Sequence, residues 1–185
     1  SYTNPMSLCV KTLYHVFPQI KAFGCCHEVF GTQKVLRDIV RLETGKTDIE
    51  RDEILVDVVG INHFTWFTRA SYQGMDPVYD RFIDQHFEEG YNDPDRNWMN
   101  GTFNCAHRVK FDLFKRYGAI AAAGDRHLAE FMPGDLYLKN PETVKAWKFA
   151  LTPVSWRKER QADKNAQALR LASGEEELKL DDTGE

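Results

Sequence analysis

One stretch rich in β-branched and aromatic residues, from Ile54 to Phe67, interrupts a chain whose other apolar residues recur mostly at helical spacing. Such residues fit an extended, half-buried backbone, so the stretch is predicted to form a strand or a hairpin. Helices are predicted on both sides of it, including one over about 5–17 and an amphipathic one through Val35 and Leu42. This alternation of helices and strands indicates a mixed α/β fold.

Shorter patterns predict the remaining elements and the domain boundary. These elements are a short strand over 19–23, a loop over 90–101, and helices over 76–89, 103–117 and 141–172. The 185 residues suffice for one ordinary domain, which we predict over residues 1–172. Residues 173–185 are acidic with few apolar side chains, and we predict that they form a mobile tail.

The charge and the apolar pattern exclude several classes of partner. A formal net charge of -4 and a pI near 5.9 provide no general attraction for nucleic acid or for an anionic membrane surface. No apolar run approaches the roughly 20 residues of a membrane helix, and residues 1–20 lack the pattern of a secretory signal. The four cysteines do not form the dense framework of a secreted disulfide protein. We therefore predict a cytoplasmic protein with free thiols.

Two residues are candidate metal ligands, and each is predicted to lie where a strand meets a loop: Cys26 and His63. A thiolate and an imidazole suit a borderline divalent metal. Taken alone, such a cysteine is more often a buried thiol, and such a histidine is more often a hydrogen-bonded residue of a strand. Their spacing also differs from that of a closed four-ligand zinc site. An open site, completed by water or by substrate oxygens, fits the pair better.

Two further groups of ionisable residues have both ordinary and functional interpretations. Residues 125–130 hold four ionisable side chains, a density that also occurs on solvated helix faces. His27 and Glu28 stand at a predicted helix start, where charged residues are common because of the helix dipole. Neither group alone assigns a function.

Together these segments resemble glycoside hydrolase family 4. Tyr2-Thr3-Asn4-Pro5-Met6 is similar to the N-x-N-P-M loop of the family, and Cys25-Cys26-His27-Glu28 is similar to its C-H-E variant. The segment from Gly60 to Phe67 matches G-x-N-H-x-x-W-F. The segment from Gly124 to Phe131 resembles the G-D-x-H-x-x-E-[FY] stretch of the α-glucosidase and α-galacturonidase branch. The motifs occur in the family's order, and the resemblance extends from residue 1 to about residue 160.

The resemblance implies a fold and an assembly. It implies a lactate-dehydrogenase C-terminal-domain-like mixed sheet with packed helices, in which residues 1–172 form part of the catalytic or substrate domain. The family begins with a Rossmann half that carries a glycine-rich phosphate loop, whereas the present sequence contains no G-x-G-x-x-G. We therefore expect a fragment, and we expect a homo-oligomer, either a dimer or a tetramer.

The resemblance further implies two cofactors, NAD and Mn²⁺, and a redox route that differs from the usual displacement by two carboxylates. NAD⁺ would take a hydride from C3 of a sugar, a base would remove the acidified C2 proton, and the C1–O bond would break by elimination. Cys26 and His63 match the metal ligands of the family. Asn4 matches an asparagine that contacts the nicotinamide and the sugar hydroxyls, and Asn62 matches another sugar contact.

The same resemblance assigns roles in proton transfer and substrate binding. His27 would bind the substrate or protonate the leaving group, and Asp125 would be the C2 base. Arg126 and His127 would orient that base or pair with a carboxylate of the substrate. The C-H-E form points away from phosphorylated sugars, which leaves an unphosphorylated α-galacturonide or α-glucoside as the small carbohydrate substrate.

Two alternatives to a family 4 glycosidase remain. One is an oxidoreductase related to lactate or malate dehydrogenase, which would have no thiolate metal ligand. The other is a non-catalytic fragment that binds no cofactor. Metal analysis separates the first alternative from the glycosidase, and equilibrium dialysis with NAD⁺ separates the second.

Overall fold

The computed structural model describes residues 5–92, 99, 101 and 104–177, and it divides into two compact units. The first unit is Ser1–Ala150 and the second is Leu151–Glu185. Each is described by itself. The assignment of residues 1–172 to a catalytic or substrate domain remains a prediction.

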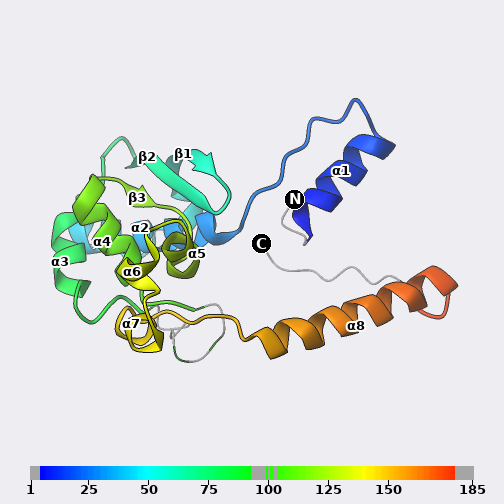
Figure 1. The fold of residues 1–185 in the computed structure, drawn as a ribbon. Helices are drawn as coiled ribbons and strands as arrows, with labels where there is room; N and C mark the ends of the chain where they lie inside the picture. Colours follow the sequence, from blue (N-terminus) through cyan, green and yellow to red (C-terminus); the bar gives the residue numbers. More distant parts are fainter. Residues whose placement is uncertain (1–4, 93–98, 100, 102–103, 178–185) are drawn as a thin grey trace. The chain divides into compact units, whose positions relative to one another are not determined.

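The first unit contains a three-stranded antiparallel sheet (Figure 1). Strand β1 (Ile54–Ile61) pairs with β2 (Phe64–Tyr72), and β2 pairs with the short β3 (Ile120–Ala121). The hairpin predicted from the β-branched stretch is therefore confirmed. Its second strand runs further along the chain, to Tyr72.

A bulge in the hairpin aligns its buried side chains. Phe67 and Ala70 are both buried, although residues three apart should face opposite sides of a regular strand. The ladder shifts register between Asp57 and Val58, whose partners are Arg69 and Phe67. The extra residue of β2 at this point turns Phe67 and Ala70 to the same side.

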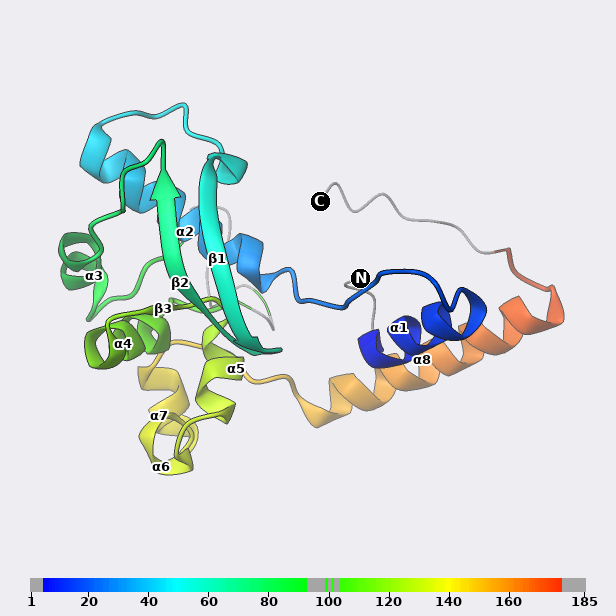
Figure 2. The ribbon, with the colours of Figure 1, turned by 90° about the horizontal axis from the view of Figure 1, so that it is seen from above.

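The first unit also contains helices. They are α1 (Met6–Val16), α2 (Glu28–Thr44), the short 3-10 helix η1 (Arg51–Glu53), α3 (Asp80–His86), α4 (Arg108–Tyr117), α5 (Asp125–Glu130), α6 (Gly134–Tyr137) and α7 (Pro141–Ala146). Figure 2 shows the hairpin of β1 and β2 lying across α2, and α2 contacts β1. The mixed α/β fold with helices packed on an antiparallel sheet is confirmed.

Two apolar clusters hold these layers together. The first joins the inner face of α2 to the sheet and to α3, and it contains Leu36, Ile39 and Ile83, none of which has measurable exposed surface. The second joins α4, β3, α5 and α6, and it includes Leu113 and Leu128. These clusters fix the positions of α2, of the hairpin and of α5. The site described below lies where these three elements meet.

A buried lysine ties α4 to the chain segment that follows β3. The Lys110 ammonium donates hydrogen bonds to the carbonyl oxygens of Ala121 (2.8 Å) and Ala123 (2.6 Å) and to Thr32 Oγ1 (2.8 Å). Only 1% of Lys110 is exposed. Because all three donors of the ammonium have acceptors, the cost of burying the charge is partly offset.

The second unit contains α8 (Val154–Ser173), which ends at Gly174 in the left-handed conformation. The last described turn is held by Arg170 Nε, which donates to Glu176 at 2.8 Å. The predicted mobility of residues 173–185 stays a prediction, and 178–185 lie outside the described residues. In the part of the chain that the structure describes, no helix combines the length and apolar character required to cross a bilayer.

The strand predicted over 19–23 is wrong, because this segment joins no sheet in the described part of the chain. Its backbone is satisfied by a side chain instead. The Tyr14 hydroxyl donates to the carbonyl oxygen of Ala22 at 2.7 Å and accepts from the Ala22 N–H at 3.3 Å. A local side chain has therefore replaced the neighbouring strand that the pattern anticipated.

The single helix predicted over 141–172 is also wrong, because α7 and α8 are separate helices. Lys148 has a φ of 54°, outside the helical region, and Pro153 stands directly before α8. Proline lacks an N–H group and disfavours helical backbone in the residue before it. It therefore starts α8 and cannot continue α7. The predicted helices over 76–89 and 103–117 exist in shorter form as α3 and α4.

Candidate metal and substrate site

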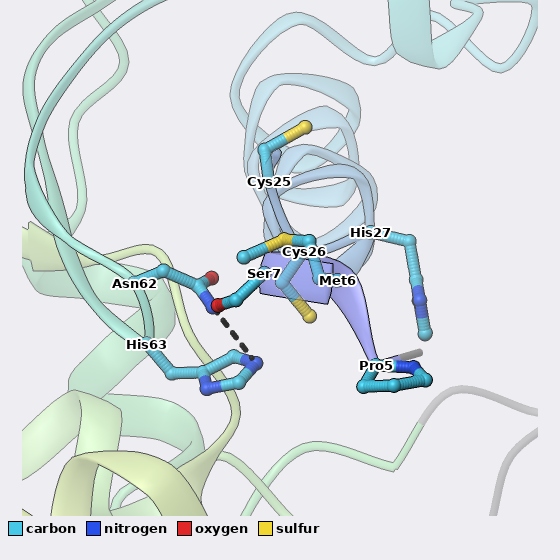
Figure 3. A pocket seen from close by; sticks show the side chains of 8 residues that line it. All are labelled: Pro5, Met6, Ser7, Cys25, Cys26, His27, Asn62 and His63. Atoms are coloured by element: carbon cyan, nitrogen blue, oxygen red, sulfur yellow. Dashed lines mark hydrogen bonds between the residues drawn. The ribbon is translucent and has the colours of Figure 1, made fainter. Parts of the chain in front are cut away.

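A pocket opens where α1 begins, where α2 begins and where the hairpin turns (Figure 3). Its lining residues are Pro5, Met6, Ser7, Cys25, Cys26, His27, Asn62 and His63. Four residues predicted from separate motifs therefore line one pocket: Cys26, His27, Asn62 and His63. Asn4, the predicted contact for NAD and sugar, lies outside the described residues.

Local backbone features place the two predicted metal ligands. Cys26 lies just before α2, and His63 lies in the two-residue connection between β1 and β2. Gly60 has a φ of 111°, and a β-carbon there would clash with the carbonyl oxygen of Phe64. Only glycine fits this close approach of the two strands. Figure 3 shows the Cys26 sulfur pointing toward the His63 ring, whereas the Cys25 sulfur points away from it.

The possible ligand atoms of Cys26, Glu28 and His63 all lie within 4.8 Å of one another. The structure thus brings the predicted pair together and adds a carboxylate. Sequence reasoning placed Glu28 at a charged helix start and in the C-H-E motif, but it did not propose Glu28 as a metal ligand. The signal that could have revealed it is the spacing of two residues from Cys26 at the first turn of α2.

The surroundings alter the proton affinity of both predicted ligands. Burial raises the pKa of the Cys26 thiol to about 11. A hydrogen bond with the backbone of Glu28 lowers this pKa, whereas the negative charge of the Glu28 side chain raises it. Burial lowers the pKa of His63, and the nearby His127 lowers it further. In the absence of a cation, both groups are therefore held in their neutral forms. A bound cation would have to displace the proton of the thiol.

Residues of α5 complete the site from the other side. The rings of His63 and His127 stack with their centroids 4.0 Å apart and their planes 11° from parallel. Arg126 Nη2 lies 3.1 Å from His127 Nε2, and Glu130 Oε2 lies 3.5 Å from His127 Nδ1. The ionisable group over 125–130 thus contributes two of its predicted substrate contacts, Arg126 and His127, next to His63.

Asn62 contacts His63, the candidate metal ligand, directly. Its Nδ2 lies 3.4 Å from His63 Nε2, and its side chain lines the pocket (Figure 3). His27 lines the same pocket and is exposed to solvent. Both residues are therefore placed where a sugar in the pocket could meet a hydrogen-bond donor or acceptor.

Asp125, predicted as the C2 base, lies apart from the residues that line the pocket. Its carboxylate has no exposed surface. The two carboxylate oxygens accept hydrogen bonds from the backbone N–H groups of Val109 and Lys110, each at 3.1 Å. These two N–H groups belong to the first turn of α4, where backbone N–H groups have no acceptor within their own helix. This position gives Asp125 a structural role, and its role as a base stays a prediction.

Asp125 also belongs to a second group of possible ligands, with Cys105 and His107. Cys105 Sγ lies 3.9 Å from His107 Nδ1. Burial raises the pKa of Cys105 to about 12 and lowers that of His107 to about 3, so both side chains are neutral. The Lys110 ammonium already supplies a positive charge beside Asp125. We therefore interpret this group as part of the packing around the start of α4.

The burial of Asp125 predicts a distinct pH dependence of stability. Burial raises its pKa from 3.8 to about 6, against the opposing effects of Lys110 and the two N–H donors. A carboxyl whose pKa is raised by folding stabilises the fold at low pH, and this contribution is lost as pH rises from about 4 to about 6. It amounts to about 3 kcal/mol at most, from roughly 1.4 kcal/mol per pKa unit.

The measurement is urea unfolding of the wild type and of Asp125→Asn across that pH range. The free energy of unfolding of the wild type minus that of the variant should fall as pH rises from about 4 to about 6. A difference that stays constant, or that rises, would show that the pKa of Asp125 is not raised in the folded protein.

Comparison with known proteins gives consistent matches along the chain. The model of the family 4 glycosyl hydrolase C-terminal domain matches residues 58–184, and the family 4 glycosyl hydrolase model matches residues 1–42. An alpha-galacturonidase of Lachnoclostridium phytofermentans is 62% identical over 187 residues, which cover 100% of this chain and 40% of that protein. An alpha-galacturonidase of Thermoanaerobacterium saccharolyticum is 57% identical, with the same two coverages.

Two solved structures are also similar. The crystal structure of lplD from Bacillus subtilis is 52% identical, has a TM-score of 0.74, and is matched over 100% of this chain and 42% of that one. A 6-phospho-alpha-glucosidase from gut microorganisms, solved in complex with NAD and Mn²⁺, is 16% identical with a TM-score of 0.46 over 78% of this chain and 30% of that one. The chain spans about 40% of the length of the curated relatives it matches.

Proposed function

Because the chain belongs to glycoside hydrolase family 4, we propose that it is part of an enzyme that hydrolyses an unphosphorylated α-glycoside, and specifically an α-galacturonide. The observation that carries this proposal is the meeting of Cys26, His27, Asn62 and His63 in one pocket. Four alpha-galacturonidases at 52–62% identity support the choice of substrate over an α-glucoside. The family assignment leaves a lactate or malate dehydrogenase relative without support.

The donor atoms in the pocket fit a divalent cation. Cys26 provides a sulfur and His63 provides a nitrogen, and borderline divalent metals accept both. A cation such as Mn²⁺, when bound there, supplies Lewis-acid stabilisation of negative charge on the sugar oxygens at C2 and C3. The protein's part is to hold Cys26 and His63 close together, through the start of α2 and the tip of the hairpin. The Asn62 amide lies beside His63 Nε2, and its NH₂ group could donate to that nitrogen only while the nitrogen carries neither a proton nor a cation.

The second cofactor implied by the family is NAD, which supplies the oxidising equivalent at C3. The 185 residues contain no glycine-rich phosphate loop, so we propose only Asn4 as a contact for NAD within this chain. The complete enzyme is proposed to bind NAD and to assemble as a homo-oligomer.

Arg126 and His127 are proposed to bind the carboxylate that distinguishes a galacturonide from a neutral sugar. Their side chains lie 3.1 Å apart, beside the His63 ring. A guanidinium pairs with a carboxylate through two parallel hydrogen bonds, and the imidazole of His127 would provide a further polar contact beside it. This pairing would hold the sugar with its C2 and C3 hydroxyls toward Cys26 and His63.

Two proton transfers are required in the proposed reaction. His27 lines the pocket and is proposed to hold the proton that the leaving-group oxygen receives. Asp125 is the base predicted to take the C2 proton. Because the Asp125 carboxylate is buried at the start of α4, labelling of C2 is the experiment that decides this role.

The test of the proposed function is hydrolysis of an α-galacturonide in D₂O with NAD⁺ and Mn²⁺ present. Elimination breaks the C2–H bond, so we expect the released galacturonate to carry deuterium at C2, detected by proton NMR. The α-galactoside with the same leaving group is the control, because it differs only in lacking the carboxylate that Arg126 and His127 would bind, and we expect it to be cleaved more slowly. Product without deuterium at C2, or cleavage that proceeds without NAD⁺, would contradict the elimination route.

Asp125→Asn refines this test. If Asp125 is the base, incorporation of deuterium should slow by about 10²–10⁴-fold, the usual contribution of a general base. Unchanged incorporation in a folded variant would assign the base to another residue.

A further inference from the structure

The carboxylate of Glu28 lies beside the two proposed metal ligands. Its nearest oxygen, Cys26 Sγ and a His63 ring nitrogen all lie within 4.8 Å of one another. The Glu28 side chain is 20% exposed, so it is not sealed in the core. A thiol, an imidazole and a carboxylate therefore converge from the start of α2 and from the tip of the hairpin.

A backbone N–H holds one oxygen of this carboxylate, and the carboxylate also forms a hydrogen bond with the Cys26 thiol. Glu28 Oε2 accepts a hydrogen bond from the N–H of Gly124 at 3.0 Å. Glu28 Oε1 lies 3.7 Å from His127 Nε2, which is beyond hydrogen-bond distance. A β-carbon at Gly124 would lie 2.8 Å from Oε1, so the absence of a side chain at Gly124 leaves room for the carboxylate.

This arrangement has the features of a metal-ligating carboxylate. Ligating carboxylates are usually held by a hydrogen bond to their second oxygen, and these outer partners orient the ligand. Gly124 N–H occupies that place for Glu28. Catalytic metal sites also commonly use three protein ligands and leave the remaining positions to water or substrate.

We propose that Glu28 is a third protein ligand of the divalent cation held by Cys26 and His63. This inference rests on the proposed function, because it assumes that those two residues bind the cation. With three protein ligands, the cation would be held on one side, and its open side would face the pocket that His27 and Asn62 line. The competing role for Glu28 is to position His127 through charge alone.

The test measures binding of Mn²⁺ alone to the purified protein, by electron paramagnetic resonance of the free ion. Glu28→Gln removes the negative charge, but its amide oxygen can still accept the hydrogen bond from Gly124. We expect Mn²⁺ to bind at least about 10–100-fold more weakly to this variant, since loss of an outer-shell partner already costs that much. Glu130→Gln is the matched control, because Glu130 contacts His127 but is not among the three grouped ligands. Its affinity for Mn²⁺ should be unchanged.

Two further variants separate ligation from positioning. Gly124→Ala keeps the carboxylate but displaces it, so it should weaken Mn²⁺ binding in the same direction as Glu28→Gln. With Co²⁺ in place of Mn²⁺, Glu28→Gln should change the visible d–d bands, which report the number and type of ligands. The charge-transfer band from the Cys26 sulfur should persist in that variant and should disappear in Cys26→Ser.

The outcomes distinguish this inference from the function on which it rests. If the wild type binds no Mn²⁺, or if Cys26→Ser binds it normally, the proposed metal site itself is wrong. If Cys26→Ser loses binding while Glu28→Gln keeps wild-type affinity and d–d bands, Glu28 is not a ligand and the two-residue site stands. If Glu130→Gln weakens binding as much as Glu28→Gln does, the carboxylates act through His127, and ligation by Glu28 is overturned.

Discussion

Cys26→Ser is expected to raise the dissociation constant for Mn²⁺ by more than about 100-fold and to abolish hydrolysis of an α-galacturonide. A thiolate binds a borderline divalent cation as an anion, whereas a serine hydroxyl remains neutral and is a poorer donor. The loss should exceed the roughly 10–100-fold effect of removing an outer-shell partner, because a direct ligand is removed. Isothermal titration of the purified protein with Mn²⁺ measures the change.

The neighbouring cysteine provides the control for this experiment. Cys25→Ser makes the same chemical change one residue away, but the Cys25 sulfur points away from His63 (Figure 3). Its Mn²⁺ affinity should match that of the wild type. Equal losses in the two variants would mean that the start of α2 is disturbed, and stoichiometric binding in Cys26→Ser would refute the assignment.

Lys110→Met is expected to lower the free energy of unfolding by about 3–5 kcal/mol, as is usual when one member of a buried, hydrogen-bonded charge arrangement is removed. Methionine fills a similar volume but donates no hydrogen bond. The carbonyl oxygen of Ala123 and the hydroxyl of Thr32 would lose their contacts with the ammonium. Asp125 would also lose the nearby positive charge. Urea unfolding at neutral pH measures the effect.

Lys115→Met is the matched control on the same helix. Lys115 Nζ pairs with Asp84 at 2.7 Å, but the two side chains are 40% and 67% exposed. Exposed ion pairs contribute about 0–1 kcal/mol, so this variant should remain close to the wild type. A similar loss in both variants would show that the network around Lys110 contributes little beyond the packing of α4.

The sequence motifs indicated residues that line one pocket, but only the fold showed how they meet. Cys26, His63 and Asn62 belong to motifs whose order carries information, so they could be found without coordinates. The stacking of His127 on His63 could not, because it depends on the docking of α5 beside the hairpin. The hydrogen bond that holds the Glu28 carboxylate likewise depends on the fold, since its partner Gly124 lies 96 residues further along the chain.

Asp125 shows why a motif position does not reveal burial. A charged residue at the first position of a short helix usually faces solvent and favours the positive end of that helix. Asp125 instead faces the start of a different helix, α4, 15 and 16 residues earlier. That interaction depends on the tertiary packing of α4 against α5, for which the local sequence provides no periodic signal.

The predicted elements were wrong where a local feature, such as a proline or a side-chain hydrogen bond, had more influence on the backbone than the apolar periodicity. The apolar pattern over 141–172 continues past the point where Pro153 starts a new helix. The short strand over 19–23 had suitable residues but no adjacent strand. The hairpin and α2 were predicted well, because each has a long run of residues with one consistent periodicity.

The connection between β1 and β2 limits how this part of the chain can change in length. Ile61 pairs with Phe64, so only Asn62 and His63 lie between the strands, and both line the pocket. One inserted residue would shift the imidazole by about 3.3 Å along the strand direction. Surface loops usually accept insertions and deletions, but in this connection both residues line the pocket. We therefore expect that gaps in an alignment of active relatives avoid this turn, and that a peptide tag inserted here would be tolerated by the fold but not by the site.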